Sequence, residues 1–279
     1  PLTATANSEI NGLTLYSVGS GTVIDHIQVS YSGDDSYEWF GGTVNAKYLV
    51  ALRGWDDDFD TDNGFVGKVQ FFVSLRDPAS ADQSQSNGFE SDNDADGSTL
   101  TPVTAPLFSN GSIFGPLATS STTINSLYRN AMHLRRGTRT SIYNTVFAGY
   151  PTGLYIDGQK GDSPAQATSN VLQIENCVIA GMTANYSTTY LTDAEAWYTT
   201  TSRNNQVMVT NDLLQITAPF NLASPNFLPA AGSPLLSGAA FTNTRLTDSF
   251  FTSVAYRGAF GTTNWTANWC NFDPQNADY

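Results

Sequence analysis

The segment Asn110-Gly-Ser-Ile-Phe-Gly115 recurs twice further along the chain, as Asn144-Thr-Val-Phe-Ala-Gly149 and as Asn176-Cys-Val-Ile-Ala-Gly181. Each copy places an Asn five residues before a Gly, and the copies begin 34 and 32 residues apart. One supersecondary unit of this size cannot bury its apolar face alone, so neighbouring copies must stack on each other. The repeat therefore predicts a solenoid of β-strands.

A degenerate form of this repeat occupies the preceding part of the chain. Residues 29–33 and 50–54 end in Gly, residues 73–77 end in Asp, and these copies lie 21 and 23 residues apart. A period in the low twenties suits one coil of three short strands and three turns, and the longer intervals later on predict inserted loops. We therefore expect an all-β fold, a right-handed single-stranded parallel β-helix with long loop insertions.

The repeated Asn110, Asn144 and Asn176 predict a ladder at one turn position of successive coils. An Asn side chain there can bond the backbone of the adjacent coil and satisfy groups that no strand pairs. The alternative is that Asn occurs at these positions only because it favours turns.

Composition favours one large β-helix domain over residues 1–279. Hydrophobic residues make up 40% of the 279 residues, and no long segment has a sustained 3.6-residue apolar period. Helix is expected only as a short turn over 191–197, capped by Thr192 or Asp193.

A solenoid needs a cap at each end, and this requirement leads to expectations for both ends of the chain. An alternating strand over 12–18 begins almost at the N-terminus, so we expect further N-terminal coils, their cap and a targeting signal to be missing here. Residues 240–279 are expected to form a C-terminal capping segment. No apolar run approaches the length that crosses a bilayer, which leaves room for a lipid anchor on the missing N-terminal piece.

The charge balance is strongly acidic, with 12 Lys and Arg against 25 Asp and Glu and a formal net charge of −13. A nucleic-acid partner is disfavoured, because phosphate binding needs a basic stripe. An acidic surface suits an extracytoplasmic protein, secreted or at the cell surface, in a medium that contains calcium. The alternative is that the net charge serves solubility alone.

The two cysteines, Cys177 and Cys270, leave two interpretations open. A disulfide between them would require the C-terminal tail to fold back onto the coil with the third Asn. A single buried thiol in the stack is equally ordinary.

Acidic residues between Asp34 and Asp96 recur at one place in each early coil. Aligning the coils gives two columns, an aromatic one of Tyr37, Phe59 and Phe89 and an acidic one of Glu38, Asp60 and Glu90. Strand side chains alternate, so the aromatic column is expected inside and the acidic column outside. Coils lie about 4.8 Å apart, so the carboxylates need a cation, Arg partners or protons between them.

Two acidic stretches follow the calcium-binding pattern D-x-D-x-D. The predicted Ca²⁺ ligands are Asp58, Asp60 and Asp62 in one stretch and Asp92, Asp94 and Asp96 in the other. Both stretches lack a Glu at the twelfth position, so neither is an EF-hand. The alternatives are a strand with solvated acids for the first stretch and a mobile loop for the second.

Arg53 and Arg76 are placed in one column with Ser32, beside the acidic residues. A structural ladder of Arg and carboxylate groups is one account of them. The functional account is a groove for an anionic or polyhydroxylated chain, in which Trp39 and Trp55 offer flat faces to sugar rings. Burial of either Trp is the alternative.

Five segments, 12–42, 55–64, 67–78, 86–94 and 256–279, carry a family resemblance. In them the chain resembles a group of uncharacterised secreted or lipid-anchored proteins of Bacteroidota. The resemblance implies a right-handed parallel β-helix and an N-terminus longer than the present one, and it implies no activity.

The expected fold is also similar to that of pectate lyases and polygalacturonases. A polygalacturonase-like site needs a Gly-His-Gly and an Arg-x-Lys, but the only histidines, His26 and His133, have no Gly neighbours, and Arg-x-Lys is absent from the sequence. A calcium-dependent lyase needs acids that hold Ca²⁺ and a base. The acids could be Asp60, Glu90 or Asp92, and the base could be Arg53 or Arg76.

Two functions follow as hypotheses. The first is a non-catalytic, calcium-stabilised β-helix outside the cytoplasm that binds a glycan or joins a cell-surface protein assembly. The second is a calcium-dependent polysaccharide lyase acting on uronate-containing glycans.

Overall fold

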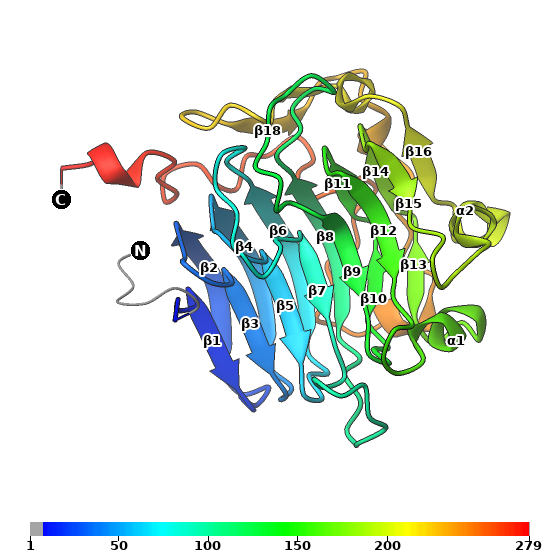
Figure 1. Ribbon diagram of the computed structural model, residues 1–279. Helices are drawn as coiled ribbons and strands as arrows, with labels where there is room; N and C mark the ends of the chain where they lie inside the picture. Colours follow the sequence, from blue (N-terminus) through cyan, green and yellow to red (C-terminus); the bar gives the residue numbers. More distant parts are fainter. Residues whose placement is uncertain (1–7, 279) are drawn as a thin grey trace.

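Each coil of the chain contributes strands to two sheets, and in both sheets all neighbouring strands run parallel (Figure 1). The computed structural model describes residues 8–278. The seven-stranded sheet comprises β1 (Leu13–Tyr16), β3 (Tyr37–Phe40), β5 (Phe59–Asp62), β7 (Phe89–Ser91), β9 (Asn130–Leu134), β12 (Thr152–Ile156) and β15 (Ala184–Tyr186). The nine-stranded sheet comprises β2 (Val23–Ser30), β4 (Asn45–Leu52), β6 (Lys68–Leu75), β8 (Leu107–Phe114), β10 (Ser141–Tyr143), β11 (Val146–Ala148), β13 (Gln173–Glu175), β14 (Val178–Ala180) and β16 (Gln206–Met208). The expectation of an all-β parallel solenoid is confirmed.

The remaining elements are short. An antiparallel pair, β17 (Ile216–Ala218) and β18 (Asn226–Pro229), follows the last coil. The helices are α1 (Ser163–Thr168), α2 (Ala194–Thr199), and the 3-10 turns η1 (Thr201–Arg203), η2 (Asn211–Leu214), η3 (Pro234–Leu236), η4 (Thr244–Leu246) and η5 (Pro274–Asn276). The expected helical turn is α2, which begins after Asp193, whereas α1 was not expected. In residues 8–278 no helix has the length and apolar character that a membrane crossing requires.

The repeated Asn marks a bend that every coil of the nine-stranded sheet makes at one position. Asn110, Asn144 and Asn176 have φ angles of 59°, 53° and 57°, in the left-handed region that Asn tolerates. The copies stack in register, because Val146 pairs with Ser112 on one side and with Val178 on the other. The period read from this segment is therefore confirmed.

The Asn side chains bond side chains of adjacent coils, where a bond to the backbone was expected, and they also bond the C-terminal segment. Asn144 accepts a hydrogen bond from Ala240 N–H at 2.9 Å, and the Asn110 side-chain amide donates to the carbonyl of Tyr256 at 3.1 Å. The Asn144 side-chain amide also donates to the hydroxyl of Ser109 in the adjacent coil at 3.1 Å. These amides therefore connect the bend both to a neighbouring coil and to the C-terminal segment.

Of the expected C-terminal segment, residues 240–278 are described, and they lie along the side of the stack. Their contacts run from Asn144 back to the first coil, where Gln28 accepts from the N–H of Asn271 at 2.9 Å (Figure 1). The segment therefore covers the outer face of the nine-stranded sheet. The expected domain bounds, 1 and 279, fall outside the described residues.

The degenerate copies are shifted by one residue at their start. Val50 pairs with Val73 as expected, but Val29 pairs with Ala51. Tyr31 donates its N–H to the carbonyl of Leu52 at 2.8 Å, which aligns Tyr31 with Arg53. The placement of Arg53 in the column of Ser32 is therefore wrong.

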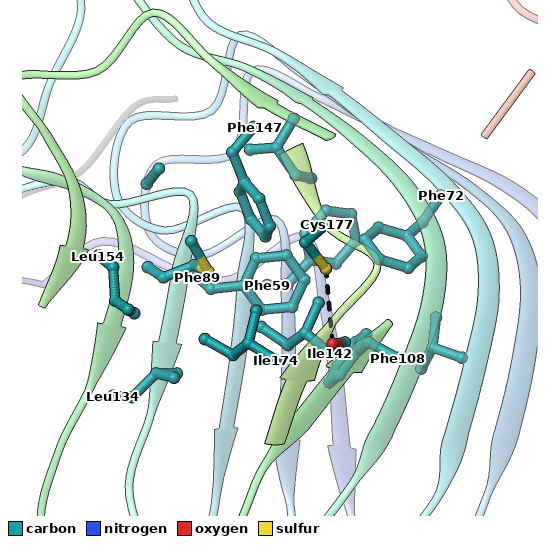
Figure 2. Close-up of a cluster of buried hydrophobic side chains, with 14 of the residues drawn as sticks. Phe59, Phe72, Phe89, Phe108, Leu134, Ile142, Phe147, Leu154, Ile174 and Cys177 are labelled. Carbon is teal, nitrogen blue, oxygen red and sulfur yellow. Dashed lines mark hydrogen bonds between the residues drawn. The ribbon is translucent and has the colours of Figure 1, made fainter. Parts of the chain in front are cut away.

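Aromatic rings fill the space between the sheets (Figure 2). The ring centroids of Tyr37 and Phe59 are 5.4 Å apart and those of Phe59 and Phe89 are 5.3 Å apart, so the predicted aromatic column is confirmed. Burial of each ring contributes about 1.5–3 kcal/mol. Both cysteines are free, and Cys177 lies in this core with its Sγ 3.5 Å from the carbonyl oxygen of Ile142.

Candidate functional site

The predicted acidic column exists on the outer face of the seven-stranded sheet. Glu38 of β3 pairs with Asp60 of β5, and Asp60 pairs with Glu90 of β7. The same column continues into His133 of β9 and Tyr155 of β12. Residues distant in sequence therefore form one row, which is acidic at one end and carries an imidazole and a phenol at the other.

Five carboxylates converge at the acidic end of this row, and we call them the carboxylate cluster. One oxygen each of Asp35, Glu38 and Asp60 lies within 4.8 Å of the others, and Asp34, Asp35 and Asp56 form a second such group. A cavity of about 430 Å³ borders the cluster beside Asp34 and Asp56. In the described part of the chain, no Arg, Lys or His forms an ion pair with these five groups.

A second ladder of side chains positions the cluster. Asn11 accepts from the N–H of Asp35 at 3.2 Å, and Asp35 accepts from the N–H of Asp57 at 2.9 Å. Asp57 in turn accepts from the N–H of Asn87, which accepts from Asn130 N–H at 3.1 Å. Each coil thus holds the acid of the preceding coil in a fixed orientation.

Burial and like charge raise the pKa values in the cluster. The pKa of Glu38 is raised to about 7, first by burial and then by nearby acids, against the hydrogen bond from Asn11. The pKa of Asp56 is raised to about 7 by burial and by Glu90, against a hydrogen bond from Ser84. Burial and neighbouring carboxylates raise the pKa of Asp60 well above its ordinary value. Its Oδ1 is shielded from solvent without a hydrogen-bond partner among the described residues.

Toward the other end of the row, basic side chains pair with the acids. Arg135 pairs with Glu90, and its Nε lies 2.8 Å from an oxygen of Asp92. His133 lies between two carboxylates, with Nδ1 3.2 Å from Glu90 and Nε2 3.2 Å from Asp157. Burial lowers the pKa of His133, but these two hydrogen bonds outweigh it and the net shift is upward.

The predicted calcium ligands are not gathered around one point. Asp58 is fully buried with an oxygen 3.1 Å from Nε of Arg76, and only Asp60 of its stretch belongs to the cluster. Asp62, at the end of β5, lies outside both groups of convergent acids.

The second predicted stretch is also dispersed. Asp92 pairs with Arg135 and Arg136. Asp94 accepts hydrogen bonds from Ser98, and Asp96 is 93% exposed. These carboxylates satisfy a turn and two guanidinium groups.

Two predicted sugar-contacting residues are inaccessible. Trp39 is fully buried, because it lies on the inner face of β3 with its ring 5.3 Å from that of Phe65. Arg76 is fully buried against Asp58, so its predicted contact with a ligand is also wrong. Arg53 pairs with Asp77 and lies over the Tyr31 ring, while Trp55 is partly exposed.

Sequence reasoning missed four members of the cluster as ligands, Asp34, Asp35, Glu38 and Asp56. A signal was present, because Asp34 and Asp56 each precede a residue of the aromatic column by three positions. Stacked coils bring such equivalent turns together. The extension of the row to His133 and Tyr155 was hidden by the long interval between β7 and β9.

Comparison with known proteins gives one match. Residues 2–216 match the family model of the pectate-lyase like beta helix domain. No curated protein and no solved structure matches the chain.

Proposed function

The chain belongs to the pectate-lyase-like β-helix family, and from this premise we propose that it is an extracytoplasmic protein that binds a uronate-containing glycan through Ca²⁺, without catalysis. The observation that carries the proposal is the carboxylate cluster on the outer face of the seven-stranded sheet. Five acids held together without a basic partner in the described residues need a cation or protons, because like charges at this distance repel.

The cluster fits calcium by its donors and spacing. Ca²⁺ takes six to eight oxygen ligands at 2.3–2.6 Å, so two oxygens on one ion lie no more than about 5 Å apart. The carboxylates of Asp35, Glu38 and Asp60 meet this limit with their oxygens within 4.8 Å. Three protein carboxylates leave room for a carboxylate of the glycan.

The rest of the row suits the sugar. A cavity of about 160 Å³ lies beside Glu90, His133 and Arg135 and is also bordered by Tyr155. Arg135 presents a guanidinium to an anionic substituent, and the phenol ring offers an apolar edge to a pyranose. Because Ca²⁺ at the acidic end and the guanidinium at the other end would both attract carboxylates, the row favours a glycan that carries carboxylates over a neutral one.

The state of the arginines favours binding over elimination. A lyase needs a base beside the uronate, but Arg76 is buried, Arg53 pairs with Asp77 and Arg135 pairs with Glu90 and Asp92. Burial lowers the pKa of Arg135, but the neighbouring acids raise it by more, so the net shift of this pKa is upward. A guanidinium in this state does not accept a proton.

A lyase is the second candidate because of Glu38. Its pKa of about 7 lies where a carboxylate works as a general base. Calcium bound beside it would lower that pKa and favour the ionised form.

Calorimetric titration of polygalacturonate, alginate and glucuronate oligomers, with Ca²⁺ and with chelator, tests the proposal. We expect Ca²⁺-dependent binding, its loss in Asp60→Asn, and its retention in the control Asp96→Asn. Ultraviolet absorbance of unsaturated products on the same ligands separates the two candidates. Steady product formation would establish the lyase, and no binding to any polyuronate would favour a protein partner in a surface assembly.

A further inference from the structure

A cavity of about 560 Å³ lies between α1 and α2, at the end of the row remote from the carboxylate cluster. Both helices lie beside the last coils of the seven-stranded sheet (Figure 1). Tyr190 and Trp197 line the cavity together with Thr168, Thr192 and Thr200. Its wall thus combines two aromatic rings with hydroxyl groups, which is the surface chemistry that suits a pyranose ring.

A series of stacked rings connects the row to the cavity. The ring of Tyr155 stacks on His133 at 4.9 Å, and the ring of Tyr190 follows at 6.4 Å with an interplanar angle of 18°. Tyr190 is the last ring of this series and is 40% exposed. From Asp60 to the coil of Tyr190 the row rises by four coil spacings, about 19 Å.

The aromatic wall is rigid. The Trp197 indole N–H donates to the carbonyl of Ala167 at 2.9 Å, which ties α2 to α1. The Arg203 guanidinium lies 4.0 Å from the centroid of the indole ring and packs against it. A ring held on two sides loses little freedom when a ligand packs against it.

The charge of the cavity differs from that of the row. Among the described residues that line it there is no Arg or Lys, and Asp193 contributes a carboxylate. A uronate would meet repulsion here without a compensating cation, whereas an uncharged ring would not.

We propose that the α1–α2 cavity is a second subsite for the glycan, which packs a neutral pyranose against Tyr190 and Trp197. That one glycan chain occupies both this cavity and the carboxylate cluster rests on the proposed function. Together the two sites select a heteroglycan that carries a uronate about 19 Å from a neutral sugar.

The first test uses glucuronoxylo-oligosaccharides of three to six residues with Ca²⁺ in calorimetry. We expect affinity to rise with length, and Tyr190→Ala to weaken the longest oligomer about two- to tenfold while sparing the shortest. Tyr190→Phe keeps the ring and is expected to behave as the wild type. Leu213→Ala removes a comparably exposed side chain, 47%, outside the row and is the matched control.

The second test uses neutral xylohexaose without Ca²⁺ in saturation-transfer NMR. We expect transfer to the sugar ring protons in the wild type and in Asp60→Asn, and its loss in Tyr190→Ala. Equal signals in Tyr190→Ala and the wild type, or no signal in either, overturn the subsite even when uronates bind at the carboxylate cluster. A signal that depends on Tyr190, with no uronate binding, supports the cavity and overturns the acidic site.

Discussion

The backbone N–H of Asp57 donates to Oδ1 of Asp35 at 2.9 Å, so one oxygen of a buried acid is committed to the next coil. The same carboxylate belongs to the carboxylate cluster, where one of its oxygens lies within 4.8 Å of oxygens of Glu38 and Asp60. The stacking of coils thereby builds the site, because the bond that fixes the acid is the same kind of bond that aligns the turns.

Calcium is expected to stabilise the protein strongly. At a Ca²⁺ concentration of 100 times Kd, binding to the folded state adds about 2.7 kcal/mol, or roughly 5–10 °C in Tm for a chain of this size. Asp60→Asn removes a ligand and a like charge, so its Tm in chelator is expected to rise above the wild type and its calcium increment to shrink. Calorimetric melts of both proteins and of Asp96→Asn measure this; an equal increment in all three would contradict the assignment.

The calcium-free protein is expected to lose stability as pH rises. Glu38 and Asp56 have folded pKa values of about 7, against about 4 in an unfolded chain. Between these values the folded state holds more protons, so the free energy of unfolding falls from about pH 4 to pH 7 and then levels off. Melts in chelator across this range check the slope. Saturating Ca²⁺ is expected to flatten it, and a Tm in chelator that rises toward neutral pH would refute the account.

Asn144 is expected to stabilise the fold by two separable effects. Asn144→Gly keeps the left-handed conformation but removes both bonds to Ala240 and the bond to Ser109, with an expected loss of about 1–3 kcal/mol. Asn144→Ala also places a residue with a Cβ and no side-chain amide at a φ of 53°. This strain adds about 1–2 kcal/mol to the loss of stability. Urea unfolding should therefore rank wild type above Gly and Gly above Ala. Equal losses in the two variants would show that backbone conformation contributes nothing.

The buried pair of Arg76 and Asp58 is expected to be structural. Arg76→Met leaves a buried carboxylate without its partner, at a cost of about 3–5 kcal/mol in the free energy of unfolding. The double variant Arg76→Met with Asp58→Asn is expected to recover much of that loss in urea unfolding, with unchanged glycan affinity. Loss of glycan affinity in a folded double variant would restore Arg76 to the binding site.

The sequence by itself determined the period, the two columns and their faces. Asn at a left-handed bend and alternation along a strand are local properties, so the repeat alone aligned Tyr37 with Phe59 and Glu38 with Asp60. The D-x-D-x-D stretches do not each surround one point, because Asp60 and Asp62 lie along the extended strand β5, whereas Asp92 pairs with arginines and Asp94 accepts hydrogen bonds within a turn.

Only the tertiary structure decided which acids converge and what covers each face. Asp35 and Asp56 meet through the stacking of turns. His133 joins the row of Glu90 after a loop whose length hides its register. Trp39 lies inside by the same alternation that places Tyr37 inside, although Glu38 beside it faces outward. Contacts between coils, and between the tail and Asn144, depend on chain segments far apart in sequence, and no local pattern specifies them.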